Sequence, residues 1–426
     1  MDSGNTAWVL ASAALVLFMT PGLAFFYGGM VRSKNVLGML MQNFFCIGLV
    51  SVLWAVLLFS LAFGTDIGGG LLGGFDFVGL KDLGIADVAE AAENVPGLAL
   101  TIPPLLFVAF QLMFAIITPA LITGAIADRM KFAAWVAFVA LWMLLVYTPI
   151  AHWVFSPEGW LFQRGALDFA GGTVVHINAG IAALALVMVL GKRKGWPGDA
   201  MAPHSLPLTL LGTGILWFGW FGFNAGSALA ADGIAAQAFI NTHLAAAAAL
   251  IGWLVVERIK GGHATTLGAA SGAVAGLVAI TPCAGFVGVM PSLFIGFLAG
   301  GICFAAIQMK FRFGYDDALD VVGIHLVGGI LGSLLLGVFA DSAINPAAAD
   351  GMFNGGGFDL LGKQFLAVGA TLVWSFVVTF ILAKIIDATI GLRVKSDEEA
   401  EGLDVTQHAE AAYAYGELGS MGRSGS

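Results

Sequence analysis

Two histidines stand in apolar stretches of the sequence, and each follows an aspartate at the same interval. The first stretch, DFAGGTVVH, runs from Asp168 to His176, and the second, DALDVVGIH, runs from Asp317 to His325. A largely apolar run of residues follows each histidine. Ionisable groups within apolar segments are costly, and they usually face a cavity or one another. The repeated frame suggests that the two imidazoles share one task.

Three kinds of chemistry suit a pair of imidazoles in such segments. A hydrogen bond between helices is the simplest, and it suffices to explain a lone histidine. Two axial histidines could instead hold a haem. The third is the lining of a pore that handles protons or a small polar solute. The matched placement of His176 and His325 favours the pore.

Aromatic and hydroxyl side chains in two other apolar stretches strengthen the pore interpretation. One stretch contains FQLMF, which ends at Phe114, and the other contains GWFGFNAGSA, which includes Phe223 and Ser227. Aromatic faces can hold a cation with about 0.5–2 kcal/mol, and a hydroxyl can accept a hydrogen bond from an N–H donor. Each of these aromatic residues taken alone is more often a core or lipid-facing residue. Beside the histidines, they indicate a path for a small nitrogenous cation.

The elements that must position these residues are membrane spans. Hydrophobic residues make up 59% of the 426 residues and charged residues only 11%, with a mean hydropathy of +0.92. Soluble domains have about 45–50% apolar and about 25% charged residues, so the composition predicts an all-α protein that crosses a membrane many times. Runs of roughly 20 apolar residues can span a bilayer, and they predict eleven transmembrane helices, of which 264–281 is short enough to be re-entrant. The ranges are 7–28, 42–63, 101–125, 132–154, 170–191, 206–229, 235–256, 264–281, 285–308, 319–340 and 364–390.

The basic residues predict the orientation of these spans. All but three of the 18 Lys and Arg residues fall on one side of the predicted membrane, the exceptions being Lys81, Arg164 and Lys363. By the positive-inside rule the N-terminus lies outside and the C-terminal tail inside. The N-terminal apolar run has no basic start and no small-residue cleavage site, so it is predicted to be a first span rather than a removed signal peptide.

The two Asp–His frames open the fifth and the tenth predicted spans, which indicates an internal repeat. A unit of five spans crosses the membrane an odd number of times, so its twin must lie inverted, as in many transporters with a pathway between the halves. We expect a membrane domain over 1–392, with an inverted repeat at about 7–191 and 206–340 and an extra span at 364–390. Residues 393–426 are polar and acidic, and we expect a cytoplasmic tail with a disordered end.

Other classes of function find no support in the sequence. The three cysteines are isolated and have neither a disulfide pattern nor a metal-ligand spacing. The net charge of −9 argues against binding to nucleic acid.

Several long motifs resemble the ammonium transporters of the Amt/Mep branch. They are TPGLAFFYGGMVRSKN, DFAGGTVVHINAG, GWFGFNAGSA, DVVGIH and the tail segment GLRVKSDEEAEGLDVTQHAEAAY. They occur in the right order from the first span to about residue 415. The related Rhesus proteins carry a different sequence around the first histidine, so the resemblance is to Amt/Mep.

The resemblance implies a non-enzymatic homotrimer without a cofactor, in which each subunit has its own pore. It identifies His176 and His325 as paired pore histidines, and Phe114 and Phe223 as the stacked phenylalanines of a gate. Ser227 corresponds to the hydroxyl of an outer recruitment site.

The same resemblance gives Asp168 a supporting role near that recruitment site, where it holds the site in shape. One position departs from the family pattern. Where the family commonly has a Trp after an AH-x-V pattern, this chain has Phe155 after AHWV. We expect Phe155 to act there with Phe114, or Trp160 or Trp153 to take its place.

We therefore expect a multi-pass protein of the inner (plasma) membrane that transports ammonium, ammonia and methylammonium. The species that crosses remains open among ammonia, ammonium, and ammonia with a separately relayed proton. The tail implies regulation by a cytoplasmic PII-type signal protein. Two alternatives stay in view, namely an ammonium sensor that transports little and a haem-binding membrane redox protein.

Overall fold

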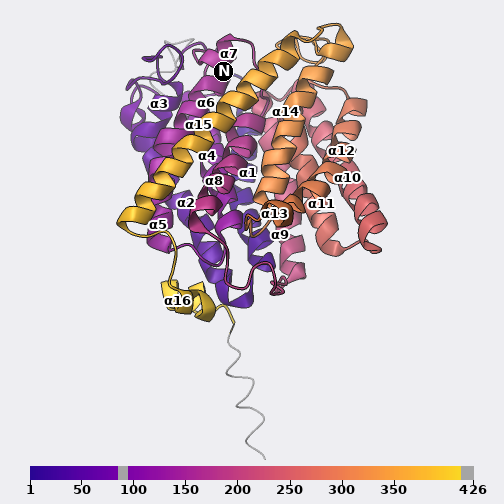
Figure 1. Cartoon of the computed structure of the whole chain (residues 1–426). Coiled ribbons are helices and arrows are strands. Elements are labelled where there is room, and N and C mark those ends of the chain that lie inside the picture. Colours follow the sequence, from indigo (N-terminus) through magenta and orange to yellow (C-terminus); the bar gives the residue numbers. More distant parts are fainter. Residues whose placement is uncertain (85–94, 414–426) are drawn as a thin grey trace, which may run out of the picture.

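The computed structural model describes residues 1–84 and 95–413, and this part of the chain is a bundle of helices (Figure 1). The described residues contain three isolated β-bridges and no strand. The helices of the first half are α1 (Ser3–Met30), η1 (Ser33–Asn35), α2 (Val36–Leu53), η2 (Trp54–Leu58), α3 (Phe59–Phe63), η3 (Val78–Leu80), α4 (Pro104–Ile126), α5 (Phe132–Trp142), η5 (Met143–Tyr147), α6 (Thr148–Phe155), α7 (Trp160–Gln163), η6 (Gly172–Ile177) and α8 (Asn178–Leu190). Those of the second half are α9 (Leu206–Ala225), η7 (Gly226–Ala228), α10 (Gly233–Gly261), α11 (Thr266–Ile280), α12 (Val289–Ile307), α13 (Met309–Phe313), η8 (Val322–Leu326), α14 (Val327–Phe339), η9 (Met352–Asn354), α15 (Asp359–Thr389), α16 (Ser396–Glu401) and α17 (Leu403–His408).

The apolar helices agree closely with the predicted spans. Among the described residues, ten helical runs are long and apolar enough to cross a membrane. The remaining predicted span, 264–281, corresponds to α11, which has 15 residues and so rises about 22 Å. Buried turns over 281–287 continue α11 toward the start of α12. The second run starts at Ser33, nine residues before the predicted start, and the fourth continues to Gln163.

The two ends of the described chain lie on opposite faces of the bundle. In Figure 1 the N-terminus is at one end and α16 is at the other. We call these the N-terminal side and the tail side. On the tail side, Arg32 pairs with Asp128 at 2.9 Å, and the Lys131 ammonium donates to the Ile390 carbonyl at 3.0 Å.

Helices at corresponding positions of the two predicted five-span units pack against each other. Helix α1 lies along α9, and α8 contacts η8. Glycines allow the α1–α9 contact. A Cβ on Gly212 would lie 2.2 Å from the Phe26 nitrogen, and one on Gly219 would lie 2.2 Å from Met19 Cγ. Small residues let helix backbones approach closely inside a membrane.

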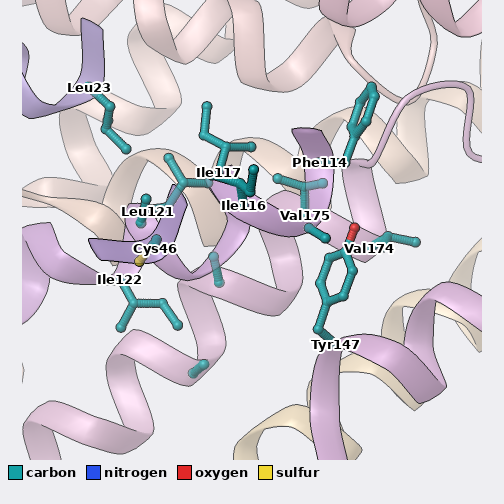
Figure 2. Close-up of a cluster of buried hydrophobic side chains, with 14 of the residues drawn as sticks. Leu23, Cys46, Phe114, Ile116, Ile117, Leu121, Ile122, Tyr147, Val174 and Val175 are labelled. Carbon is teal, nitrogen blue, oxygen red and sulfur yellow. The ribbon is translucent and has the colours of Figure 1, made fainter. Parts of the chain in front are cut away.

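The core surrounds α4, whose side chains pack on several neighbouring helices. Figure 2 shows Ile116, Ile117, Leu121 and Ile122 of α4 among side chains from α1, α2, η5 and η6. These side chains are buried. Helix α4 therefore provides a fixed central element beside η6, the segment that carries the first histidine.

The tail folds back onto the tail side of the bundle. The Leu403 N–H donates to Asn35 Oδ1 at 2.8 Å, and the Gly38 N–H donates to Asp404 Oδ1 at 2.8 Å. Residues 414–426, which include the predicted disordered end, lie outside the described residues.

Candidate functional site

Each Asp–His frame forms a π-helical turn, and the aspartate accepts hydrogen bonds from the backbone N–H groups at its start. The Asp168 carboxylate accepts hydrogen bonds from the N–H groups of Gly171, Gly172 and Thr173 at 2.7–2.8 Å. The π-helical segment η6 starts there and carries His176. Carboxylates stabilise the start of a helix by accepting from its free N–H groups. Asp168 therefore fixes the backbone that aims His176.

The second frame repeats this arrangement. The Asp317 carboxylate accepts from the N–H groups of Val321 and Val322 at 3.1 and 2.7 Å, and the π-helical segment η8 starts at Val322 and carries His325. Single π-helical turns are frequent at functional sites. The two frames, 149 residues apart, therefore form the same local structure, a π-helical turn with an aspartate at its start.

The two histidine rings meet at the centre of the bundle. The Nδ1 atoms of His176 and His325 lie 3.2 Å apart, and the rings are nearly parallel, at 24°, with centroids 5.3 Å apart. Both side chains are buried. One Nδ1 must carry the shared hydrogen and the other must accept it. One ring then presents an Nε2–H donor and the other an Nε2 acceptor.

Glycines allow the histidine-bearing helices to approach. A Cβ on Gly180 would lie 2.5 Å from the Leu326 nitrogen, and one on Gly329 would lie 3.1 Å from His176 Cβ. Any larger residue at Gly180 would push η8 away from α8. The contact between the rings therefore depends on these two positions.

Both rings line a small apolar cavity, the inner cavity. Its volume is about 10 Å³, and its other walls include Leu23, Trp220 and Phe223. This volume is roughly the least that can hold one molecule the size of water. The buried His176 Nε2 has no hydrogen-bond partner among the described residues. A small polar molecule in the inner cavity could supply the missing partner.

A column of aromatic rings closes the inner cavity toward the N-terminal side. The Phe114 and Phe223 rings lie 4.5 Å apart between centroids, and Phe223 also stacks on His176 at 6.0 Å. Trp220 lies parallel to His176 at 5.5 Å, and its Nε1–H donates to Thr281 Oγ1 at 2.9 Å. Phe223 faces the inner cavity and Phe114 faces the next one. The two phenylalanines thus form a partition.

Beyond this partition is a larger cavity, the outer cavity, on the N-terminal side. Its volume is about 240 Å³. Seven phenylalanines line it, together with the polar side chains of Gln111, Asp168 and Ser227. The phenylalanines are Phe107, Phe110, Phe114, Phe155, Phe162, Phe169 and Phe286. Aromatic faces around a few oxygen atoms are suited to a small cation that also donates N–H hydrogen bonds.

Ser227 faces the outer cavity as a hydrogen-bond acceptor. It lies in η7, directly after α9, and its hydroxyl donates to the Phe223 carbonyl at 2.8 Å. Because that hydroxyl hydrogen is engaged, the lone pairs of Oγ remain for an N–H donor.

The aromatic residues proposed for the outer cavity occupy different places. Phe155 lines the cavity. Trp160 does not, since it packs edge-on against Trp153 at 5.7 Å. The Trp153 Nε1–H donates to the Leu71 carbonyl at 2.9 Å. Phe155 is therefore the only one of these three that can contact a cation in the cavity.

Sequence reasoning missed several lining residues. Phe107 lines the outer cavity, and Trp220 lines the inner one. Helical spacing could have found both, because Phe107 precedes Phe114 by seven residues and Trp220 precedes Phe223 by three. Phe162 lies on α7, a short helix between two of the predicted spans.

A third cavity lies on the tail side of the histidines. Its volume is about 230 Å³, and charged side chains line it, among them Arg32, Asp128, Arg193 and Lys310. Lys310 pairs with Asp320 at 2.6 Å. Burial raises the pKa of the neighbouring Asp317 to about 6, and the Asp320 carboxylate adds to the rise. The three cavities follow one another from the N-terminal side to the tail side.

The site does not fit a haem. A porphyrin is far larger than the inner cavity of about 10 Å³ that the histidines face. Protein interiors are densely packed, so the side chains around the histidines cannot move apart far enough to admit one. Among the described residues no group of three or more His, Cys, Asp or Glu is placed to hold a metal ion. The haem interpretation of the histidine pair is therefore rejected on the size of the cavity.

Comparison with known proteins gives an independent result. The Ammonium Transporter Family matches residues 7–413. An ammonium transporter of Mycobacterium tuberculosis is 54% identical over 434 residues, covering 97% of this chain and 91% of its own length. The crystal structure of Saccharomyces cerevisiae Mep2 is similar with a TM-score of 0.86 and 36% identity, covering 93% of this chain and 89% of that chain. A structure of a sensor Amt protein also has a TM-score of 0.86, with 31% identity and coverage of 96% and 98%.

Proposed function

The chain belongs to the ammonium transporter family, and from this premise we propose that it carries ammonium or ammonia through a pore in each subunit. Members of this family are transporters or channels rather than enzymes. The proposed pore runs from the outer cavity, past Phe114 and Phe223, to His176 and His325. The observation that carries the proposal is the 3.2 Å histidine pair in a cavity of about 10 Å³ behind the phenylalanine partition.

The first step is capture of ammonium in the outer cavity. The rings of Phe114 and Phe155 offer cation–π contact, and the Ser227 oxygen accepts an N–H hydrogen bond. Asp168 keeps the wall of the outer cavity in shape rather than binding the ion, because backbone N–H groups at the start of η6 donate to its carboxylate. Methylammonium retains three N–H donors and should also enter.

The second step is separation from bulk water. A bare ion in an apolar interior costs tens of kcal/mol, so an intact ammonium ion does not cross the inner cavity without losing its charge or gaining polar partners. The histidine pair offers one nitrogen acceptor and one N–H donor. It can solvate ammonia, or take a proton from ammonium and pass it on. Potassium has neither a proton to release nor an N–H to donate, and should be excluded.

Reconstitution tests this function directly. Purified protein in liposomes should take up labelled methylammonium faster than empty liposomes do, and an excess of ammonium should suppress the uptake. An equal excess of potassium should leave it unchanged. Uptake no faster than that of empty liposomes would contradict transport.

A sensor function is the second candidate, because the sensor Amt protein matches nearly the whole chain at a TM-score of 0.86. A sensor would bind ammonium yet transport little. The uptake measurement described above separates the two functions.

We further propose a homotrimer and a PII-type partner on the tail side, both of which come from the family resemblance. The docked tail segment, which is held by Asn35 and Gly38, offers a surface for such a partner. The mass of the solubilised complex tests the trimer. Retention of a PII protein by membranes with the full chain, compared with a chain that ends at residue 392, tests the tail's part in docking.

A further inference from the structure

A groove opens on the side of the bundle that α15 crosses. Helix α15 runs diagonally over this side (Figure 1). It starts beside α14, where Leu361 meets Gly337, and ends beside α5, where the Ile390 carbonyl accepts from Lys131. Toward the tail side it therefore leaves α14 and its neighbours uncovered. The uncovered region is a groove of about 630 Å³ among α8, α12, α13 and η8, which we call the lateral groove.

The walls of the lateral groove are apolar. Leu184 and Met188 of α8, Ala306 of α12 and Phe313 of α13 line it, with Leu326 and Val327 at the junction of η8 and α14. Met188 and Phe313 are more than half exposed. The outward side chains of α15 on the same side of the bundle are also apolar and exposed, including Val373, Val377 and Ile381. This side is therefore suited to the hydrocarbon of a bilayer.

The tail-side end of the lateral groove carries uncompensated positive charge. Lys192 lines it, and the exposed Arg312 adjoins Phe313. Neither has an ion-pair partner within residues 1–84 and 95–413. The one carboxylate in the lining, that of Asp316, is engaged by Arg193 at 2.9 Å. Positive charge at this end would complement a bound anion.

An aromatic pair places this end at the depth of lipid headgroups. The Lys192 ammonium lies 5.1 Å from the centre of the Trp196 ring, which stacks on Phe311 with centroids 5.9 Å apart. Tryptophan and lysine are characteristic of the membrane–water interface. An apolar groove that ends in cations at headgroup depth has the polarity of an anionic phospholipid.

We propose that the lateral groove binds one anionic phospholipid of the tail-side leaflet. An acyl chain lies along Leu184, Ala306 and Val327, and the phosphate lies near Lys192 and Arg312. Leu326 directly follows His325, so the lipid packs behind the helix segment that carries a pore histidine. The site is independent of the proposed transport, because none of these residues lines the outer or the inner cavity.

Lipid retention tests the proposal. The full-length protein is purified from liposomes that contain equal phosphatidylglycerol and phosphatidylcholine, and mass spectrometry counts the lipids that remain bound. We expect about one phosphatidylglycerol per subunit, preferred by up to about thirtyfold because each basic residue near an anionic lipid adds roughly fivefold. The double variant Lys192→Ala/Arg312→Ala should lose most of this preference. Val327→Phe, which narrows the apolar part, should reduce retention of both lipids.

A matched variant controls for loss of charge alone. Arg258 and Lys260 are exposed at the end of α10, on the tail side but outside the lateral groove, so Arg258→Ala/Lys260→Ala should keep the preference. Equal retention of the two lipids by the unaltered protein would overturn the proposal. So would equal losses from the two double variants. A change of oligomeric state in Val327→Phe, without loss of lipid, would show that a second copy of the chain covers the groove instead.

Discussion

Asp168 and Asp317 position the two buried histidines, His176 and His325, by the same contact, each carboxylate accepting backbone N–H groups at the start of the π-helical segment that carries the histidine. The backbone that carries each histidine is therefore fixed by an aspartate in the same way. The geometry of the histidine pair depends on residues that need not touch the transported molecule.

Replacing Asp168 with Ala should therefore reduce transport through loss of positioning. Loss of a helix cap costs about 0.5–2 kcal/mol, and a tilted His176 loses its contact with His325. We expect methylammonium uptake to fall about tenfold, as for the loss of one hydrogen bond of about 1.4 kcal/mol.

Asp232 provides the matched control, because it caps α10 by accepting from the Ala235 N–H at 2.9 Å. Asp232→Ala should lower the unfolding temperature by a similar amount and leave uptake unchanged. If both variants lose uptake equally, Asp168 acts through stability alone.

Gly180→Ala should separate the two histidine helices. The added Cβ would lie 2.5 Å from the Leu326 nitrogen, and overpacking of this kind costs about 1–3 kcal/mol. We expect lower uptake in a protein that still folds. Gly214→Ala, at an exposed position of α9 with nothing within 4 Å, should retain full uptake. Normal uptake by Gly180→Ala would mean that the ring contact is not needed.

Phe223→Leu should keep the partition apolar but remove its ring contacts with Phe114 and His176. Aromatic pairs contribute about 0.5–1.5 kcal/mol beyond area burial, so we expect uptake to fall about threefold to tenfold. Phe221→Leu is the control, because that ring stacks on Phe239 at 4.0 Å and lines neither cavity. The concentration dependence of uptake measures both variants, and equal effects would argue against a gate.

The pKa of Asp317 predicts a pH effect on stability. Burial, and secondarily Asp320, raises it from 3.8 to about 6. The folded carboxyl therefore binds a proton more tightly than the unfolded one, and its contribution to stability declines as the pH rises from about 4 to about 6. The unfolding temperature of Asp317→Asn in detergent should lack this decline. Parallel pH profiles of the two proteins would contradict the assignment.

Much of this arrangement could be predicted from the sequence, because composition and periodicity are local properties. The apolar runs predicted the membrane helices, and the repeated frame drew attention to His176 and His325 before their 3.2 Å contact was known. The family motif predicted a stacked pair at Phe114 and Phe223; the two rings do meet, with centroids 4.5 Å apart, but they are tilted by 51° rather than stacked.

Other features depend on long-range packing and could not be read from the sequence. The clearance at Gly180 is set by the Leu326 backbone, nearly 150 residues away. Phe155, rather than Trp160, faces the outer cavity because Trp160 packs on Trp153. Spacing identifies the residues that share a helix face, but only the neighbouring helices decide which face meets a cavity.

The most direct test of the histidine pair compares ammonium with potassium in the same liposomes. We measure the ratio of ammonium flux to potassium flux for the unaltered protein and for His176→Ala/His325→Ala, with His243→Ala as a control because His243 is an exposed residue of α10. We expect the double variant to lower this ratio by about tenfold or more, which corresponds to the loss of one buried hydrogen bond, and the control to keep it. An unchanged ratio in a correctly folded double variant would contradict the claim that the two imidazoles make the pore selective.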